Sequence, residues 1–273
     1  MNLPPIGFGC SPYRPGGSRV DLEGPVRAAL AAGYRLFDLA ELYGNERAVG
    51  RALRGWRDLF LVGKVWRTNF RPEALRQACE GSLRRLGVDA FDLYLLHAPE
   101  AWKHLGPLED PGEIGWEEFA RRALTQEPDD VPLRETWEAM EDLKSRGLAG
   151  SIGVSNFAPE QIEALDSLPA ANQIESSPYR PHEETAAWCR ERGIALMAHS
   201  PLSAPGLLDE PVLAAMAAGH GCSPAVIALR WNVQRGLVPL PSSTDPGHIA
   251  ENLRALEIEL DAREMAAVGG LME

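Results

Sequence analysis

The chain has 273 residues, of which 45% are hydrophobic and 24% charged, as is usual for a globular protein. Its formal charge of −12 and its pI near 5.1, without any basic run, argue against binding to nucleic acid or an anionic membrane, because both call for clustered Lys and Arg. No segment reaches the ~18 apolar residues of a membrane span, and the N-terminus lacks the features of a signal peptide. We therefore expect a cytoplasmic protein, and a monomer.

The cysteines are widely scattered, with neither the density of a secreted disulfide framework nor the spacing of a zinc site. They are Cys10, Cys79, Cys189 and Cys222. We interpret them as reduced thiols, and the sequence predicts no metal site.

Apolar runs of strand length alternate with helical patterns along the whole chain, which is typical of βα units and a parallel sheet. Most runs are apolar throughout, as strands covered on both faces should be. The expected strands are 6–9, 36–38, 60–64, 91–97, 150–155, 172–175, 194–200 and 237–240. Eight such strands, without a linker or a break in composition, favour one closed (β/α)8 TIM barrel over residues 1–273 rather than a two-domain doubly wound sheet.

The helical patterns carry their own start and stop signals. The segment 71–86 has Pro72 in its first turn, apolar residues at helical spacing and Gly87 as its C-cap. Amphipathic or apolar helices are also expected to start at Asn45 and Pro224.

The stretch 98–132 is the one long insertion between expected elements. It is polar and rich in proline, contains Trp102, Trp116 and Phe119, and follows a strand. Its length is unusual for a connection in a compact barrel and favours an active-site loop with some helix in it. A surface decoration is the alternative interpretation.

Four polar side chains lie at or just after consecutive strand ends. Asp38 closes the second strand, Tyr43 follows five positions later, Lys64 closes the third strand and His97 the fourth. In a parallel barrel the carboxyl ends of the strands carry catalytic groups. A Lys that ends an apolar strand is costly unless paired, and Asp38 is the natural partner. Lys64 beside Tyr43 would lower the pKa of the phenol from its ordinary value of about 10.

Each of these residues alone has an ordinary structural explanation. Asp38 could cap a turn, Tyr43 could be half-buried core, Lys64 could extend to solvent, and His97 could be a core histidine with its hydrogen bonds satisfied. Their joint placement at consecutive strand ends favours the functional interpretation instead. In that interpretation an acid, a phenol, an ammonium and an imidazole line one cavity.

Several motifs in order resemble those of the aldo-keto reductase family, in particular its small, bacterial-type members. DLAELYGNE at 38–46 resembles the family's Asp, Tyr and Asn-Glu pattern. The family's later motifs are resembled by GKVW at 63–66, LLHAP at 95–99 and IGVSNF at 152–157. The resemblance continues to ENLRAL at 251–256, so it covers nearly the whole chain. It implies a barrel that binds NADPH or NADH without a Rossmann domain, and the chain has no GxGxxG motif.

The resemblance also implies a reaction, the reduction of a small aldehyde or ketone to an alcohol with hydride from nicotinamide C4. Tyr43 is similar to the family's general acid, Lys64 and Asp38 to the pair that tunes it, and His97 to the residue that orients the substrate carbonyl. The cofactor would supply the difficult chemistry, and the protein would supply placement and charge stabilisation.

For the nicotinamide end of the cofactor, the resemblance implies two groups of residues. Those at the positions that hold the carboxamide are Ser155, Asn156 and Gln173. Ser-Asn after a strand also favours a turn, which is the alternative explanation. His199 stands where the family most often has a tyrosine stacked on the ring, and Ser200 and Leu202 match neighbours of the pyrophosphate.

The segment 241–252 matches the part of the family that holds the adenosine end. Its matching residues are Ser242, Ser243, His248, Glu251 and Asn252. Relatives that prefer NADPH often carry Lys and Arg where this chain has Ser242 and His248, and losing two cations weakens charge-assisted contacts to the 2′-phosphate. We therefore expect NADPH to be used with relaxed selectivity. Arg254 is a candidate substitute cation, or else a solvated residue on a helix face.

The substrate pocket is expected to be walled by Trp66 and by the long loop with Trp102, Trp116 and Phe119. The sequence lacks the long C-terminal loop of larger relatives, so we expect an open pocket that accepts aldehydes and activated ketones of mixed shape.

Two other functions are alternatives to a reductase. Some members of the family are cofactor-bound sensors or regulatory subunits with little turnover, but the presence of all four catalytic residues favours an enzyme. A metal-dependent barrel hydrolase would need His, Asp or Glu ligands at several strand ends. Only His97 and Asp38 qualify, and Lys64 between them argues against a metal.

Overall fold

The computed structural model describes residues 2–12 and 19–271. Within them, eight strands form one parallel sheet in the order of the sequence. The strands are β1 (Phe8–Gly9), β2 (Leu36–Asp38), β3 (Phe60–Val65), β4 (Phe91–Leu96), β5 (Ala149–Ser155), β6 (Ala171–Glu175), β7 (Ala195–His199) and β8 (Leu237–Pro239). The sheet closes on itself where Gly7 N donates to Pro239 O at 3.0 Å and Gly9 N to Pro241 O at 2.9 Å. The predicted (β/α)8 barrel is confirmed.

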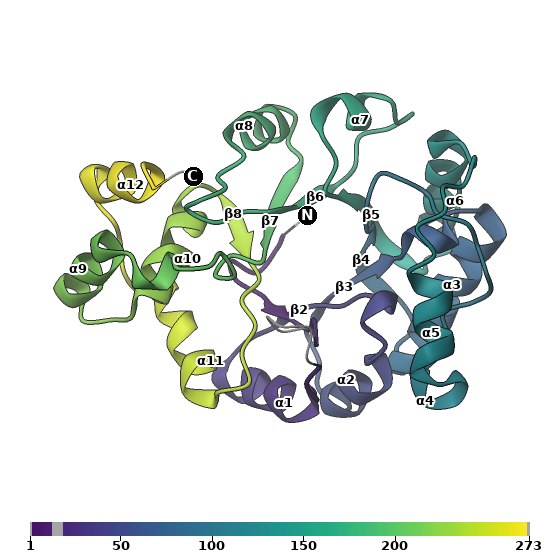
Figure 1. Ribbon diagram of the computed structural model, residues 1–273, viewed down its shortest axis with the longest axis horizontal. Coiled ribbons are helices and arrows are strands. Elements are labelled where there is room, and N and C mark those ends of the chain that lie inside the picture. The colour runs from purple at the N-terminus through teal and green to yellow at the C-terminus, as the bar shows by residue number, and fades with distance from the viewer. Residues whose placement is uncertain (1, 13–18, 272–273) are drawn as a thin grey trace.

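Helices surround the barrel (Figure 1). The α-helices of the described residues are α1 (Glu23–Ala32), α2 (Glu46–Leu53), α3 (Pro72–Leu86), α4 (Pro111–Ile114), α5 (Trp116–Ala123), α6 (Leu133–Ser145), α7 (Pro159–Glu163), α8 (Glu183–Glu191), α9 (Pro211–His220), α10 (Pro224–Gln234), α11 (Pro246–Asn252) and α12 (Ala262–Gly269). Short 3-10 helices are η1 (Glu41–Tyr43), η2 (Arg67–Asn69), η3 (Leu207–Asp209) and η4 (Leu253–Leu256).

The local signals in the sequence explain most element boundaries. Helix α3 begins at Pro72 and ends before Gly87, whose φ of 74° is the left-handed C-cap conformation that glycine adopts without strain. Helix α10 begins at Pro224, as predicted. Asn45 is the N-cap position of α2, but its side chain donates to Cys10 O at 2.9 Å instead of capping the helix. Strand β1 is shorter than the predicted 6–9.

Two apolar layers hold the barrel together. The inner layer fills the barrel with branched and linear side chains, which include Leu36, Val62, Leu93, Leu95, Met197 and Val238. The larger layer lies between the sheet and the helices, where Trp137 and Phe37 are fully buried. Because both faces of each strand are covered, most of the strand residues are apolar, as the sequence pattern indicated.

The long stretch between β4 and α6 packs close to the carboxyl ends of the strands. It contains α4 and α5, and an isolated bridge joins Trp102 to Pro128. Its buried residues Leu108 and Phe119 pack with Leu42 and Trp66. The insertion is thus anchored beside the segment that carries Tyr43.

The structure also bears on membrane-spanning helices, on the cysteines and on groups of side chains that could bind a metal. Along 2–12 and 19–271, no single helix is long and apolar enough to cross a membrane, and α9 and α10 reach that length only when joined across a 90° bend. All four cysteines are free. In the same ranges, no three His, Cys, Asp or Glu side chains are grouped as metal ligands.

Candidate active site

The four catalytic candidates meet at one end of the barrel. Asp38 is the last residue of β2, Lys64 lies near the end of β3, and His97 directly follows β4. Tyr43 is the last residue of η1, the short turn that follows β2. Because the strands are parallel and in sequence order, their carboxyl ends place all four side chains at the same mouth.

Lys64 is the centre of this group. Its side chain is 0% exposed, and Nζ lies 2.8 Å from both carboxylate oxygens of Asp38. Nζ also donates to Leu39 O at 3.0 Å and to Tyr43 OH at 3.3 Å. An ammonium has three protons and no lone pair, so these bonds use all its donors. The Tyr43 oxygen must therefore accept, which leaves the phenol's own proton for another acceptor.

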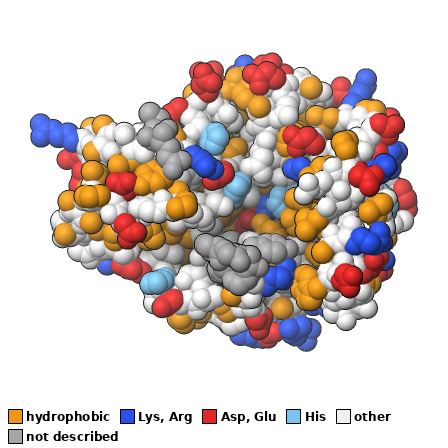
Figure 2. All heavy atoms as spheres, viewed as in Figure 1, with side chains coloured by type: hydrophobic (Ala, Val, Ile, Leu, Met, Phe, Trp, Pro, Cys, Tyr) orange, Lys and Arg blue, Asp and Glu red, His pale blue; other side chains and the backbone are white. Residues whose placement is uncertain are grey.

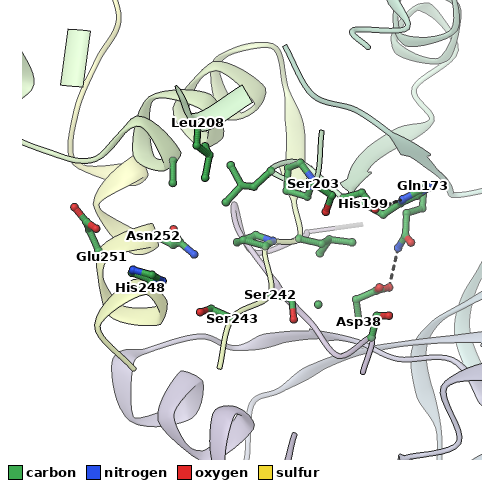
Figure 3. A pocket seen from close by; sticks show the side chains of 18 of the residues that line it. Asp38, Gln173, His199, Ser203, Leu208, Ser242, Ser243, His248, Glu251 and Asn252 are labelled. Atoms are coloured by element: carbon green, nitrogen blue, oxygen red, sulfur yellow. Dashed lines mark hydrogen bonds between the residues drawn. The ribbon is translucent and has the colours of Figure 1, made fainter. Parts of the chain in front are cut away.

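Asp38 has a second partner. Gln173, in β6, donates from Nε2 to Asp38 Oδ1 at 2.7 Å (Figure 3). The carboxylate is 3% exposed, so the ammonium and the amide replace the water that it lost. Gln173 was predicted to face a carboxamide, and here its amide nitrogen is directed at the carboxylate. The bond fixes the orientation of Asp38 toward Lys64.

Burial and mutual charge control the ionisation of these groups. Burial lowers the pKa of Lys64 from its ordinary 10.5, and the nearby Asp38 carboxylate opposes that shift. The pKa of His97 lies well below 6.5, first because the ring is buried and then because Lys64 repels a second cation. The same two causes lower the pKa of His199 to about 4. Both imidazoles are therefore neutral at neutral pH, and each has one N–H to donate.

A cavity of about 600 Å³ runs from this group to α11. Figure 2 shows the hollow at the centre of this face, with histidine side chains at its wall. Asp38, Tyr43 and His97 line one end, whereas Lys64 lies behind them. All but one of the predicted cofactor residues line the cavity: Asn156, Gln173, His199, Ser200, Leu202, Ser242, Ser243, His248, Glu251 and Asn252.

Ser155 is the exception. It is 0% exposed, and its hydroxyl donates to Gln173 O at 2.9 Å and accepts from Asn156 Nδ2 at 3.1 Å. It lies behind the wall and positions two residues that form it. Sequence analysis did not identify several further lining residues, among them Gly9, Ser11, Ser203 and Leu208. Their side chains have no distinctive chemistry, so no signal pointed to them.

Asn156 and His199 form a linked pair in the wall. His199 Nε2 lies 2.8 Å from Asn156 Oδ1, and His199 Nδ1 lies 3.2 Å from Ser200 Oγ. Since an amide oxygen only accepts, the neutral ring carries its proton on Nε2. Asn156 and Ser200 have positive φ values of 62° and 53°, a conformation that costs non-glycine residues free energy and concentrates at functional sites.

The far end of the cavity, beside α11, is more exposed than the end at Lys64. Asp245 caps α11, and its Oδ1 accepts from Gly247 N at 2.7 Å and His248 N at 3.3 Å. Among the described residues that line the cavity there is no Lys or Arg. Arg254, the predicted substitute, donates to Gly221 O at 3.1 Å and is not in the lining. The cap by Asp245 was missed, although Asp-Pro before a helix is an N-terminal signal.

The tryptophans predicted for the substrate pocket fall into two places. Trp66 lies edge-on to His97, with ring centroids 5.0 Å apart, and Trp102 lies edge-on to Trp66 at 5.6 Å. Trp116 is 47% exposed and packs against Phe119 and the Arg19 guanidinium instead. The first two therefore flank the catalytic end, and Trp116 lies farther along the insertion.

Glu41 is a buried acid near the site that sequence analysis missed. It is 2% exposed, and it accepts hydrogen bonds from Trp66 N and from Asn69 Nδ2, the latter at 3.0 Å. Burial raises its pKa to about 7, against the opposing effect of these bonds. Because Glu41 begins η1, which ends at Tyr43, its contacts connect the Tyr43 segment to Trp66.

The closed (β/α)8 barrel carries a buried Lys–Asp pair against a tyrosine hydroxyl at one end of the cavity, an arrangement of the kind used for proton transfer in barrel enzymes. The family model described as the aldo/keto reductase family matches residues 6–273. The chain belongs to the aldo/keto reductase family, whose members are oxidoreductases that reduce carbonyl compounds, typically with NADPH.

Individual relatives agree with the family assignment. The chain is 36% identical to aldo-keto reductase family 1 member C3 of Homo sapiens, over 98% of this chain and 88% of that protein. It is 37% identical to dihydrodiol dehydrogenase 3 of Bos taurus, with the same coverage. The solved structure of the aldose reductase from Schistosoma japonicum is similar with a TM-score of 0.87 and 34% identity, over 100% of this chain and 90% of that one.

Proposed function

We propose that this protein reduces aldehydes and ketones to alcohols, with a nicotinamide cofactor as hydride donor and Tyr43 as proton donor. The observation that carries the proposal is the contact of Lys64 Nζ with both Asp38 and Tyr43 OH, at the end of a cavity long enough for an extended ligand. The family's reaction is a carbonyl reduction, which requires one acid and one hydride donor.

Tyr43 is the acid in this proposal because its oxygen accepts from Lys64 and its proton is left for another acceptor. The ammonium stabilises the negative charge that develops on the phenolate as the proton leaves. Asp38 and Leu39 O keep Nζ in place, so the ammonium does not need to reorient during the reaction. A positioned general acid of this kind contributes ~10²- to 10⁴-fold to the rate.

His97 has a different role. Its pKa lies well below 6.5, so it holds no extra proton at neutral pH and cannot serve as the acid there. A neutral imidazole still donates one hydrogen bond, and the ring lies edge-on to Tyr43 at 5.9 Å. We assign to His97 the orientation of the substrate carbonyl toward the Tyr43 hydroxyl.

The cavity fits a nicotinamide cofactor. Gly9 lines it, and a Cβ at this position would lie 2.9 Å from Leu240 O, so the backbone itself forms the wall there. When bound, the nicotinamide supplies a hydride from its C4 to the carbonyl carbon. Asn156 and Gln173, supported by Ser155, would hold its carboxamide, and His199 would lie against its ring.

The rest of the dinucleotide would extend along the wall toward α11. Ser200 and Leu202 are proposed to lie beside the pyrophosphate. The adenosine end would lie against Ser242, Ser243, His248, Glu251 and Asn252, which line the far end of the cavity (Figure 3). None of these side chains is a Lys or an Arg.

Relaxed cofactor selectivity follows from that charge pattern. A 2′-phosphate gains most from Lys or Arg, and the described lining offers neither. The Asp245 carboxylate already accepts hydrogen bonds from the first amides of α11. Its negative charge therefore lies where a phosphate would bind to those amides, and it opposes that binding. We therefore propose that NADPH is used, that NADH serves nearly as well, and that neither is strongly preferred.

The substrate is proposed to be a small aldehyde or activated ketone held between His97 and the Trp66–Trp102 pair, with Trp116 as a more distant wall. The contact of Trp66 with His97 supports this placement. We further propose that the protein acts as a monomer, as most of its family does. We also propose that the protein is located in a reducing compartment such as the cytoplasm, and its four free thiols support that location.

The test is turnover of NADPH and NADH with a panel of aromatic and aliphatic aldehydes, for the wild type and Tyr43→Phe in parallel. Phenylalanine keeps the ring and removes only the proton donor. We expect the variant to bind cofactor as the wild type does and to lose most turnover. A wild type that binds cofactor but reduces no carbonyl would contradict the proposal.

A further inference from the structure

A second concave surface lies at the opposite end of the barrel from the catalytic group. It has a volume of about 790 Å³ and is formed by the ends of α2 and α3 and the loops that lead into β3 and β4. We call it the basic groove. Its charged lining residues are Arg47, Arg51, Arg54, Arg57, Arg84, Arg85, Asp58 and Asp92.

The groove is basic in a protein whose formal charge is −12. Three of its arginines are neutralised by acids outside the groove: Arg47 by Glu113, Arg51 by Glu23 and Arg85 by Glu46. The remaining three, Arg54, Arg57 and Arg84, are exposed and have no such partner. Of the two acids, Asp92 accepts a hydrogen bond from Leu61 N at 2.7 Å.

Unpaired cations are rare elsewhere in this chain. Within residues 2–12 and 19–271, the Lys and Arg side chains without an ion pair or a hydrogen bond are Arg54, Arg57, Arg84, Lys144 and Arg263. Three of these five line the basic groove. Lys144, in α6, and Arg263, in α12, lie on other helices. The free cationic groups are thus concentrated in one concave place.

The helix dipole explains only part of this pattern. Arg84 lies in the last turn of α3, where a cation is favoured by the partial negative charge of the helix end. That effect fades within one turn, and Arg57 lies beyond the end of α2 at Leu53. The loop after α2 turns on either side of Arg57, at Gly55, with φ 85°, and at Asp58, with φ 58°. The loop conformation brings Arg57 to the groove.

The groove also offers an aromatic surface. Trp56 belongs to its lining and is 42% exposed, although an indole of that size is usually covered. The Arg35 guanidinium lies 5.0 Å from its ring centre. An exposed indole can stack with the planar ring of a ligand, and the free guanidinium groups beside it can bind negative groups on the same ligand.

We propose that the basic groove binds a small, multiply charged anion that carries phosphate groups, at a site separate from the cofactor cavity. Guanidinium groups bind phosphate oxygens through two parallel hydrogen bonds, and three free ones can neutralise several charges of one ligand. The volume falls within the ~300–1,000 Å³ of small-molecule sites, which favours a compact ligand over a macromolecule. A triphosphate matches the number of free cations.

Calorimetric titration with inorganic tripolyphosphate and with ATP tests the proposal. The protein is first saturated with NADH, so that phosphate groups cannot enter the cofactor cavity. We expect one molecule of ligand per chain, with a Kd that rises with added salt because exposed charges are screened. Arg57→Gln should raise the Kd about tenfold, and the triple variant R54Q/R57Q/R84Q more, as each change removes charge-assisted bonds.

Arg263→Gln is the matched control, because it removes an unpaired arginine outside the basic groove and should leave the Kd unchanged. Trp56→Ala separates stacking of the adenine base from binding of the phosphates. If the base lies on the indole, the variant should raise the Kd for ATP and leave the Kd for tripolyphosphate unchanged. Equal Kd values for the wild type and the triple variant would overturn the proposal, as would an equal loss in the control. The NADH block rests on the proposed cofactor binding. Carbonyl reduction measured without added anion should be the same in all variants, so a failure of the anion site can be told apart from a failure of the proposed reductase function.

Discussion

The two ends of the cofactor cavity differ in how their charges are held. At the catalytic end, Lys64 and Asp38 are buried and paired, and each has further hydrogen-bond partners. At the adenosine end, Ser242 and His248 are exposed, and Asp245 is an exposed helix cap. Burial makes each contact at the first end costly to lose, whereas solvent screens the second. If the proposed function holds, chemistry depends on a few buried contacts, and cofactor choice can change at little cost in stability.

The largest expected effect comes from breaking the buried pair. Lys64→Met keeps the side-chain length and removes the charge, so Asp38 loses its cation. We expect the free energy of unfolding to fall by about 3–5 kcal/mol and carbonyl reduction to fall ~10²-fold or more. Urea denaturation and steady-state kinetics measure the two.

A double variant separates charge from packing in this experiment. Asp38→Asn together with Lys64→Met removes both buried charges, so it should be more stable than Lys64→Met alone and equally inactive. The same loss of stability in the single and the double variant would show that packing, not the unpaired carboxylate, causes it.

Substitutions at the adenosine end should change the preference between NADPH and NADH and leave stability unchanged. Ser242→Lys with His248→Arg adds two cations at the lining positions, and each charge-assisted bond is worth about tenfold in affinity. We therefore expect the ratio of kcat/KM for NADPH over NADH to rise about 100-fold, with an unchanged free energy of unfolding. If the ratio stayed constant, the cofactor would not place its 2′-phosphate here. Asp245→Asn, which removes the opposing charge, should shift the ratio in the same direction by less.

Gln173 connects the two ends, because it lines the cavity and holds Asp38. Gln173→Leu should lower the free energy of unfolding by about 1.5–3 kcal/mol, the range for a hydrogen bond to a charged group. Its loss should also raise the KM for cofactor if the amide contacts the nicotinamide. A change in stability without a change in KM would restrict Gln173 to the support of Asp38.

The last expected effect is absent at neutral pH and develops only on acidification: a pH dependence of stability from His199. Its pKa is about 4 in the folded protein and about 6.5 when unfolded. Below 6.5 the unfolded chain takes up a proton that the folded chain refuses, so stability falls as pH falls toward 4. His97 contributes to the same fall in stability. His199→Gln should therefore make the fall between pH 7 and pH 4 shallower without removing it. Thermal unfolding between pH 4 and pH 7 measures it, and an unchanged slope would contradict the assignment.

The sequence predicted the parts of the molecule that depend on local pattern. Apolar runs located all eight strands, and proline and glycine signals located α3 and α10. The pairing of Asp38 with Lys64 followed from the cost of an unpaired ammonium at a strand end, and the structure has that pair. These inferences need only the neighbours in the chain or in the adjacent strand.

The parts that could not be predicted depend on which distant side chains meet. The bond from Gln173 to Asp38 joins residues 135 positions apart, and Glu41 reaches Trp66 and Asn69 through the folding of a loop. The contacts of Trp116 with Phe119 and the Arg19 guanidinium likewise depend on the path of the insertion. The path of the loops decides which polar side chains meet in this way. Apolar periodicity predicts helices and strands and gives no information about that path.

The most direct test of the account is the rate of a single turnover in Tyr43→Phe, measured after mixing the preformed complex of protein and reduced cofactor with an aldehyde. This design separates chemistry from cofactor binding and product release. The account predicts a rate ~10²- to 10⁴-fold below that of the wild type, with an unchanged Kd for the cofactor. A rate close to that of the wild type would contradict it, because the proton would then come from a group other than Tyr43.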